Sequence, residues 1–379
     1  MAGHQGRQLT VVAAADLSPS DVQAALDGGR PLAVLPEGPT AVVEAALRAL
    51  QPEEPLEDDA DLVVATSGST GGARAVLLSA GAVLSSAHAV LDRLGGPGCW
   101  VLALPLSAVA GLQVYCRSLL AGAPPVVLAP HESLTDALSR LPGGTRRYTS
   151  LVPTQLRRFL AGEPDALLAF DAILVGGAAT DPALLTQARD LGVPVVTTYG
   201  MTETAGGCVY DGRPLDGVGV RVTDDGVELS GPTLASGYRL DAPATAAAFT
   251  GGWFRTRDAG SLSDDGLLTV TGRLDDVLIT GGANVAPSAV EAVLRDHPDV
   301  EDAVVFGRPD DEWGQRVVAA VVPTPGHRPD LADLRPWVAD RLGAPAAPKE
   351  LHLLVQLPLL HTGKPDRRAV ADAVRRGAR

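Results

Sequence analysis

The sequence predicts an α/β protein with a large N-terminal domain and a small α+β C-terminal domain, joined by a hinge. Three observations support this fold class. From residue 61 to about 198, short apolar runs alternate with segments whose apolar residues recur at helical spacing. From about 217 to 271, short strand-like runs are separated by Asp-Asp-Gly turns. The remaining residues mix predicted helices with predicted strands. A chain of 379 residues is also longer than one hydrophobic core usually supports.

The first region favours buried parallel strands. Residues 61–66 form a short apolar run typical of a buried strand, and residues 83–94 place apolar side chains at helical spacing up to Gly95, which can end a helix. The same patterns predict strands at 100–104, 126–128, 172–175 and 193–198, and helices at 111–120 and after the Asp181-Pro182 pair. Strands that alternate with helices imply parallel βαβ units in sheets.

The pattern changes twice in the second half of the chain. Turns at 224–226 and 264–266 indicate a β-rich subdomain at about 213–274. Beyond it we expect helices at 288–295 and 331–342 and strands at 302–306, 317–322 and 351–355. The predicted domains are therefore 1–274 and 275–379, with the junction near Asp275.

Composition excludes several classes of function. Hydrophobic residues make up 46% and charged residues 20%, which is a globular balance. The net charge of −14 argues against a nucleic-acid partner, because phosphate contacts need clustered lysine and arginine. Cys99, Cys116 and Cys208 lack metal or redox spacing and indicate reduced thiols. We find no secretory signal pattern and no apolar stretch long enough for a membrane span, so we expect a cytoplasmic protein without a transmembrane segment.

A Gly/Ser/Thr-rich segment directly follows the first predicted strand. Its glycines would let the backbone approach an anion, while hydroxyls and amides donate hydrogen bonds to phosphate oxygens. It lacks the spacing and the terminal Gly-Lys of a Walker loop. The alternative is an ordinary surface turn. The candidate phosphate-binding residues are Thr66, Ser67, Gly68, Ser69, Thr70 and Gly71.

A second polar segment ends the strand at 193–198. Ligands of open α/β sheets lie beyond the carboxyl ends of strands, which is where Tyr199, Gly200, Thr202 and Glu203 follow. Tyr199 could stack on a base, and the Glu203 carboxylate could hold Mg²⁺ at phosphates. The alternative is a loop with one solvated acid.

Three further residues complete the set of candidates. Asp258 could accept hydrogen bonds from two ribose hydroxyls, and Arg273 could serve a sugar or a phosphate, although singly both could be turn or salt-bridge residues. Of 31 lysine and arginine residues only Lys349 and Lys364 are lysines. A lysine kept beside Gly363 in such a chain suggests that a compact point charge is needed, the alternative being an exposed lysine without a role.

Together and in this order, the motifs resemble the adenylate-forming superfamily of acyl-CoA synthetases, luciferases and peptide-synthetase adenylation domains, over residues 61–379. The resemblance implies an AMP-binding N-terminal domain and a C-terminal domain that rotates at Asp275. It also implies roles for single residues. Thr66–Gly71 would bind phosphates, and the adenine would lie at Gly176, Gly177, Ala178 and Tyr199. Thr202 would contact the α-phosphate, Glu203 would bind Mg²⁺, and Asp258 and Arg273 would contact the ribose. Lys364 would be catalytic and would bridge the acid and the α-phosphate.

Within the superfamily, residues 105–113, 152–156, 204–212 and 231–238 resemble the actinobacterial o-succinylbenzoate-CoA ligases of menaquinone biosynthesis. This branch of the family implies an AMP-forming acid–thiol ligase that uses ATP and Mg²⁺, with CoA as co-substrate. The acid first forms an acyl-adenylate and pyrophosphate, and the CoA thiol then displaces AMP. The expected walls of the acid pocket are Leu112, Val152, Pro153, Gly206 and Gly207, and a pantetheine tunnel would be lined by Gly281 and Gly282.

Three features depart from the family pattern. Ser107-Ala108 replaces the usual His-containing pair, Ala73-Arg74 replaces Pro-Lys after the phosphate loop, and only about sixty residues precede that loop, which implies a shortened N-terminal region. The first departure leaves the acid open, so a ligase for another aryl or acyl acid, or one that loads a carrier protein, is an alternative. A non-catalytic adenylate-binding protein is another. Oligomeric state is not specified by the sequence.

Overall fold

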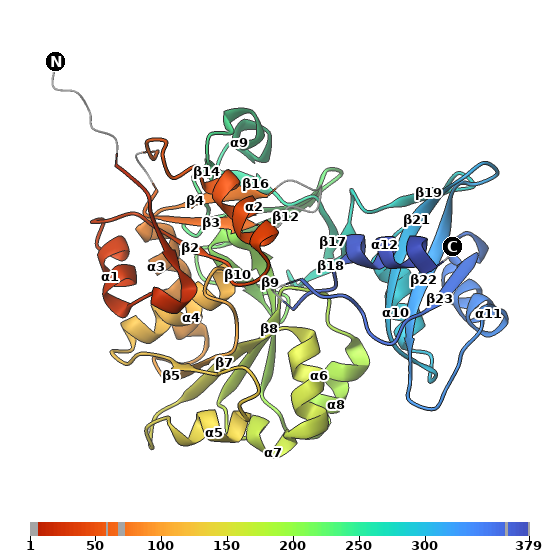
Figure 1. The fold of residues 1–379 in the computed structure, drawn as a ribbon, viewed down its shortest axis with the longest axis horizontal. Helices are drawn as coiled ribbons and strands as arrows, with labels where there is room; N and C mark the ends of the chain where they lie inside the picture. Colours follow the sequence, from red (N-terminus) through yellow and green to blue (C-terminus); the bar gives the residue numbers. More distant parts are fainter. Residues whose placement is uncertain (1–6, 58–59, 67–72, 361–362, 378–379) are drawn as a thin grey trace.

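The computed structural model describes residues 7–57, 60–66, 73–360 and 363–377. The large N-terminal domain and the small C-terminal domain lie side by side along the longest axis, with the small domain in blue (Figure 1). No helix of these ranges is long and apolar enough to span a membrane.

The first sheet of the large domain begins with parallel strands. β1 (Thr10–Ala13), β2 (Leu32–Leu35) and β3 (Leu62–Thr66) run parallel, and β4 (Arg74–Leu78) and β14 (Gly237–Tyr238) follow antiparallel. The helices that belong to this part are α1 (Pro19–Leu26), α2 (Thr40–Leu50) and α3 (Ala80–Arg93). β3 and β4 pair from Leu62 with Leu78 to Thr66 with Arg74. The predicted phosphate loop therefore joins two antiparallel strands, and its residues 67–72 lie outside the described ranges.

The second sheet contains the predicted βαβ units. Its order is β11-β10-β9-β8-β7-β5-β6, and the strands from β6 to β9 are parallel, as expected. Its strands are β5 (Cys99–Leu102), β6 (Val126–Val127), β7 (Arg147–Leu151), β8 (Ala172–Gly176), β9 (Val195–Met201), β10 (Gly206–Tyr210) and β11 (Arg213–Pro214). Its helices are α4 (Val109–Leu120), α5 (Leu134–Ser139), α6 (Pro153–Gly162), α7 (Pro164–Leu167) and α8 (Pro182–Asp190).

The β-rich subdomain and the small domain follow in chain order. The β-rich part consists of β12 (Gly219–Thr223), β13 (Gly226–Ser230), α9 (Ala242–Ala248), β15 (Phe249–Thr250), β16 (Trp253–Arg255), β17 (Asp258–Leu262) and β18 (Leu268–Arg273). The small domain consists of β19 (Leu278–Thr280), β20 (Ala283–Val285), α10 (Pro287–Arg295), β21 (Val300–Asp310), β22 (Gly314–Pro323), α11 (Leu331–Leu342), β23 (Glu350–Leu353) and α12 (Arg367–Gly377). Its sheet is largely antiparallel, and only β22 and β23 pair in parallel.

One core connects the two sheets of the large domain. Val83 and Val90 of α3 and Leu112 of α4 belong to the same buried cluster as Leu62 of the first sheet and Trp100 of the second. Because α3 and α4 are shared, the strand ends of both sheets are held in a fixed relation. The site described below lies where those ends meet.

Arg239, directly after β14, fastens this strand to the end of α2. Its side chain is fully buried and donates hydrogen bonds to the carbonyls of Leu50 and Gln51 and to those of residues 54 and 55. It also pairs with the Glu57 carboxylate at 2.7 Å. Helix ends leave carbonyl groups without partners, and this guanidinium satisfies the last carbonyl of α2, at Leu50, and those of the segment that follows it.

We expect Arg239→Met to lower the free energy of unfolding by about 3 kcal/mol, because several buried carbonyls lose their donor at once. Urea unfolding followed by circular dichroism measures this change. Arg48→Met is the matched control, since Arg48 on the same helix is 69% exposed and should contribute less than about 0.5 kcal/mol. Equal midpoints for the two variants would contradict the role assigned to Arg239.

Candidate active site

A cavity of about 870 Å³ lies at the carboxyl ends of β5, β7, β8 and β9. Its volume is within the range of pockets that enclose small-molecule ligands. The predicted site residues that line it are Thr66, Val152, Gly176, Gly177, Gly200, Thr202, Glu203, Gly206, Arg273, Asp275 and Lys364. Motifs up to about 300 residues apart in the chain thus meet at one place, where the ends of parallel strands converge.

Lys364 enters this cavity from the small domain on a tight turn. The Leu360 N–H donates to the Lys364 carbonyl at 2.7 Å, and Leu359 pairs with Pro365 across the turn. The turn also touches the large domain, because the Thr154 hydroxyl donates to the Gly363 carbonyl at 3.2 Å. The side chain passes Gly177, where an added Cβ would lie 3.2 Å from Lys364 Cε. Glycine at position 177 therefore gives the lysine room.

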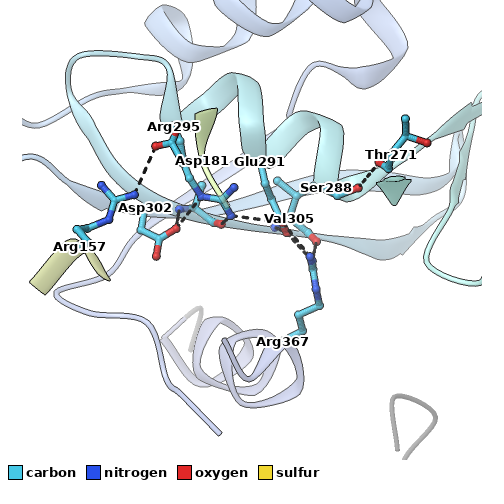
Figure 2. A network of polar contacts seen from close by, with 10 residues as sticks. Arg157, Asp181, Thr271, Ser288, Glu291, Arg295, Asp302, Val305 and Arg367 are labelled. Carbon is cyan, nitrogen blue, oxygen red and sulfur yellow. Dashed lines mark hydrogen bonds and ion pairs between the residues drawn. The ribbon is translucent and has the colours of Figure 1, made fainter. Parts of the chain in front are cut away.

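The turn is anchored to the body of the small domain three residues later. Figure 2 shows Arg367, at the start of α12, reaching Glu291 of α10 and the Val305 carbonyl of β21. Glu291 is 4% exposed and accepts from both Arg367 Nη atoms and from the Val305 N–H. A bidentate pair with a buried carboxylate fixes the base of the turn and hence the position of Lys364.

The ammonium group of Lys364 is poorly solvated. Burial lowers the pKa of Lys364, repulsion from Arg273 lowers it further, and the Glu203 carboxylate opposes the shift. An anion bound in the cavity would stabilise the charged form. In this poorly solvated position, a phosphate or carboxylate group would interact more strongly with the Lys364 ammonium than it would in water.

Glu203 accepts a hydrogen bond from Tyr238, a contact that the sequence motifs did not predict. Glu203 lies in the short helix Thr202–Thr204 after β9, and its Oε1 accepts from the Tyr238 hydroxyl at 2.9 Å. Burial raises the pKa of Glu203, while the hydrogen bond from Tyr238 and the charges of Arg273 and Arg74 lower it. Arg74 also stacks on the Tyr238 ring, 5.3 Å from its centroid.

The donor set around Glu203 suits a magnesium ion held mainly by phosphates. No group of three or more His, Cys, Asp or Glu side chains that could bind a metal is present among the described residues. Mg²⁺ typically takes one or two carboxylates and completes its shell with waters and substrate phosphates. Glu203 and the Thr202 hydroxyl fit that pattern.

Two candidate ribose-binding residues lie opposite each other in one sheet. Asp258 and Arg273 pair in the β17–β18 register, with 4.0 Å between Arg273 Nε and Asp258 Oδ1. The Tyr199 hydroxyl donates to Asp258 Oδ2 at 2.7 Å. Burial raises the pKa of Asp258, and the hydrogen bond from Tyr199 lowers it. Arg273 also binds Asp275 through two hydrogen bonds of 2.9 and 3.2 Å.

Some predicted residues do not line the cavity. Tyr199 and Asp258 lie next to lining residues, Ala178 is exposed, and Leu112 is buried in the core. Pro153 and Gly207 are adjacent to lining residues, and Gly281 and Gly282 form the turn between β19 and β20 of the small domain. Ser67, Gly68, Ser69, Thr70 and Gly71 lie outside the described ranges. The roles of all the predicted residues remain predictions.

Sequence reasoning missed a buried arginine in the cavity wall. Arg117 of α4 is 3% exposed, and its Nε has no hydrogen-bond partner. No acidic side chain of the described ranges forms a salt bridge with it, and its guanidinium stacks 5.1 Å from the centroid of Trp100. Burial lowers the pKa of Arg117. The single charged residue of a mostly apolar helix was the available signal, because such a charge is rarely buried without a partner.

Comparison with known proteins gives a consistent result. Residues 5–238 match the AMP-binding enzyme family, and residues 289–364 match the AMP-binding enzyme C-terminal domain. A probable 2-succinylbenzoate–CoA ligase of Mycobacterium tuberculosis is 48% identical over 339 residues, covering 86% of this chain and 88% of that protein. An o-succinylbenzoate CoA synthetase of Bacillus subtilis, solved with the acyl-adenylate OSB-AMP, is 27% identical with a TM-score of 0.75, covering 95% of this chain and 82% of that one. The same protein was also solved with ATP and magnesium.

Proposed function

Because this chain belongs to the AMP-binding enzyme family, we propose that it is an AMP-forming acid–thiol ligase that couples 2-succinylbenzoate to CoA. 2-Succinylbenzoate is the same compound as o-succinylbenzoate. The reaction uses ATP and Mg²⁺, both of which are bound in a structure of the Bacillus subtilis relative. The sequence resemblance assigns it to menaquinone biosynthesis.

The observation that carries the choice of acid is Arg117. 2-Succinylbenzoate has two carboxylates, and only one can be adenylated. The other would enter the cavity as a charged group that needs a buried cation. Arg117 is such a cation and has no carboxylate partner among the described residues, so pairing it with a carboxylate would offset the desolvation of both charges.

In the first half-reaction, a carboxylate oxygen attacks the α-phosphorus of ATP and pyrophosphate leaves. Two anions approach each other in this step, and Lys364 would bridge them. We assign Thr202 to the α-phosphate and Asp258 with Arg273 to the ribose. A magnesium ion at Glu203 would neutralise charge on the phosphates when bound.

In the second half-reaction, the CoA thiolate attacks the acyl carbonyl, and AMP leaves with the C–O bond electrons. We propose domain bounds of 1–274 and 275–379, with Asp275 as the hinge on which the small domain turns between the steps. Asp275 lies between β18, which ends at Arg273, and β19, which begins at Leu278. Gly281 and Gly282 would then line the path of the pantetheine.

The finer assignments of partners and location are also proposals. The net charge of −14 supports small-molecule partners rather than nucleic acid. The three cysteines are free, which supports the cytoplasm as the place of action.

Pyrophosphate release tests the proposed acid directly. We compare this acid with 3-benzoylpropanoate and 2-butanoylbenzoate, two analogues that each keep one of the two carboxylates. We expect kcat/KM for 2-succinylbenzoate to be higher than kcat/KM for either analogue by about 10²-fold or more. Acyl-CoA should form only when CoA is present.

Three other outcomes of this assay would contradict parts of the proposed function. Faster turnover of benzoate or a fatty acid would refute the acid, and product formation only with a carrier protein would refute CoA as the acceptor. No pyrophosphate from any acid would indicate a non-catalytic adenylate-binding protein.

A further inference from the structure

The amino end of α4 opens into the cavity without a side-chain cap. Its N-cap is Ala108, which has no side-chain oxygen, and Ala108, Val109 and Ala110 all line the cavity. The first amide groups of a helix have no partner within the helix, and they carry a partial positive charge. α4 extends over 12 residues, so this end can attract an anion.

A second, independent feature lies at the same place. Ser107 precedes the N-cap, is only 6% exposed and lines the cavity. Its Oγ has no hydrogen-bond partner. A buried hydroxyl without a partner is costly, because it has lost its bonds to water. A ligand atom in the cavity would restore them.

This end of α4 faces the same region as Lys364. Ser107 follows β5, which pairs with β7, and β7 in turn pairs with β8. Lys364 passes Gly177 at the end of β8, and Val152 at the end of β7 lies within 4 Å of the Cβ built at Gly177. Neighbouring strands of a sheet are about 4.8 Å apart, so the serine and the lysine lie within a few strand spacings.

We propose that Ser107 and the first amides of α4 form a subsite for the carboxylate that becomes adenylated. This inference rests on the proposed function and deepens it. Ser107 donates its hydroxyl proton to one carboxylate oxygen, and the helix end stabilises the negative charge while Lys364 approaches from the other side. The Ser107-Ala108 pair, which departs from the family pattern, thus supplies the acid contact of this chain.

The same helix then holds both ends of the acid. Arg117 lies eight residues after Val109, which corresponds to roughly 12 Å along the axis. Helical side chains lean toward the amino end, which brings the guanidinium closer to Ser107. A dicarboxylate lying along α4 would therefore place one carboxylate at Ser107 and the other at Arg117.

We expect Ser107→Ala to lower kcat/KM for the acid about 10- to 100-fold in pyrophosphate release, since hydrogen bonds to charged groups contribute that much. The KM for ATP should stay within twofold. The same loss should appear with whichever single-carboxylate analogue the wild type adenylates. Ser107→Thr, which keeps the hydroxyl, should recover most of the rate.

Thr233→Val is the matched control, because its hydroxyl is also buried and without a partner but does not line the cavity. It should leave kcat/KM unchanged. Unchanged kcat/KM in Ser107→Ala would overturn the proposal, and so would a loss confined to the dicarboxylate, which would put the serine at the other carboxylate. If the wild type adenylates a different acid, the proposed acid fails, and the Ser107 comparison is made with that acid.

Discussion

Replacing Lys364 with alanine is expected to reduce acyl-adenylate formation by at least about 10²–10³-fold, the loss typical of one preorganised donor at developing charge. The half-buried lysine enters the cavity from the small domain, and no other lysine lies in the described part of the cavity wall. Without it, the repulsion between the carboxylate and the phosphates is no longer offset at the point of attack.

ATP–pyrophosphate exchange measures this half-reaction separately. Calorimetric titration should give wild-type affinity for ATP within a few-fold, because the other residues that we assign to the nucleotide lie in the large domain. Transfer of preformed acyl-adenylate to CoA should also persist. An equal loss in both half-reactions would contradict a role confined to adenylation.

Lys349→Ala is the matched control, since it removes the only other lysine of the chain. Lys349 stacks over Trp313 in the small domain, with Nζ 4.2 Å from the ring centroid, and does not line the cavity. We expect near-normal exchange for this variant. Lys364→Arg should not rescue the rate, because the guanidinium is larger than the ammonium and Lys364 Cε already lies close to Gly177.

Much of the site could be predicted because it lies at strand ends. The segments after β3, β8 and β9 were recognisable from short apolar runs followed by glycine and polar residues. Parallel order brings the ends of β8 and β9 together, and the core shared by the two sheets places them near the end of β3. Lys364 was recognisable for a different reason, the scarcity of lysine in the chain. Neither signal needs knowledge of tertiary contacts.

The missed features depend on contacts between distant segments. Tyr238 meets Glu203 across 35 residues, and Thr154 meets Gly363 across 209 residues. No local period or spacing encodes such pairs. β4 was also missed, because it directly follows the glycine-rich segment and pairs antiparallel with β3. The predicted strand–helix alternation therefore gave no place for a hairpin there.

Replacing Arg117 with methionine is expected to reduce the selectivity for 2-succinylbenzoate and to raise the free energy of unfolding. The second carboxylate of 2-succinylbenzoate would be buried without a partner, which costs about 3–5 kcal/mol and corresponds to roughly 10²–10⁴-fold in kcat/KM. The rate with an analogue that lacks this carboxylate should not fall, so the preference for the dicarboxylate should disappear. The unliganded variant should unfold at higher urea concentration, because a buried cation without an acidic partner among the described residues has been replaced by an apolar side chain of similar length.

Arg158→Met provides the control for this substitution. Arg158 of α6 also stacks on an aromatic ring, with Cζ 4.8 Å from the centroid of Phe159, but it is exposed and does not line the cavity. It should change neither selectivity nor stability by a measurable amount. If Arg117→Met lost activity equally with the dicarboxylate and with the analogue, Arg117 would act by shaping the cavity and not by pairing with a carboxylate. A gain in stability together with a loss of discrimination is the combination that a packing role cannot produce, because cavity-forming substitutions in a core destabilise it.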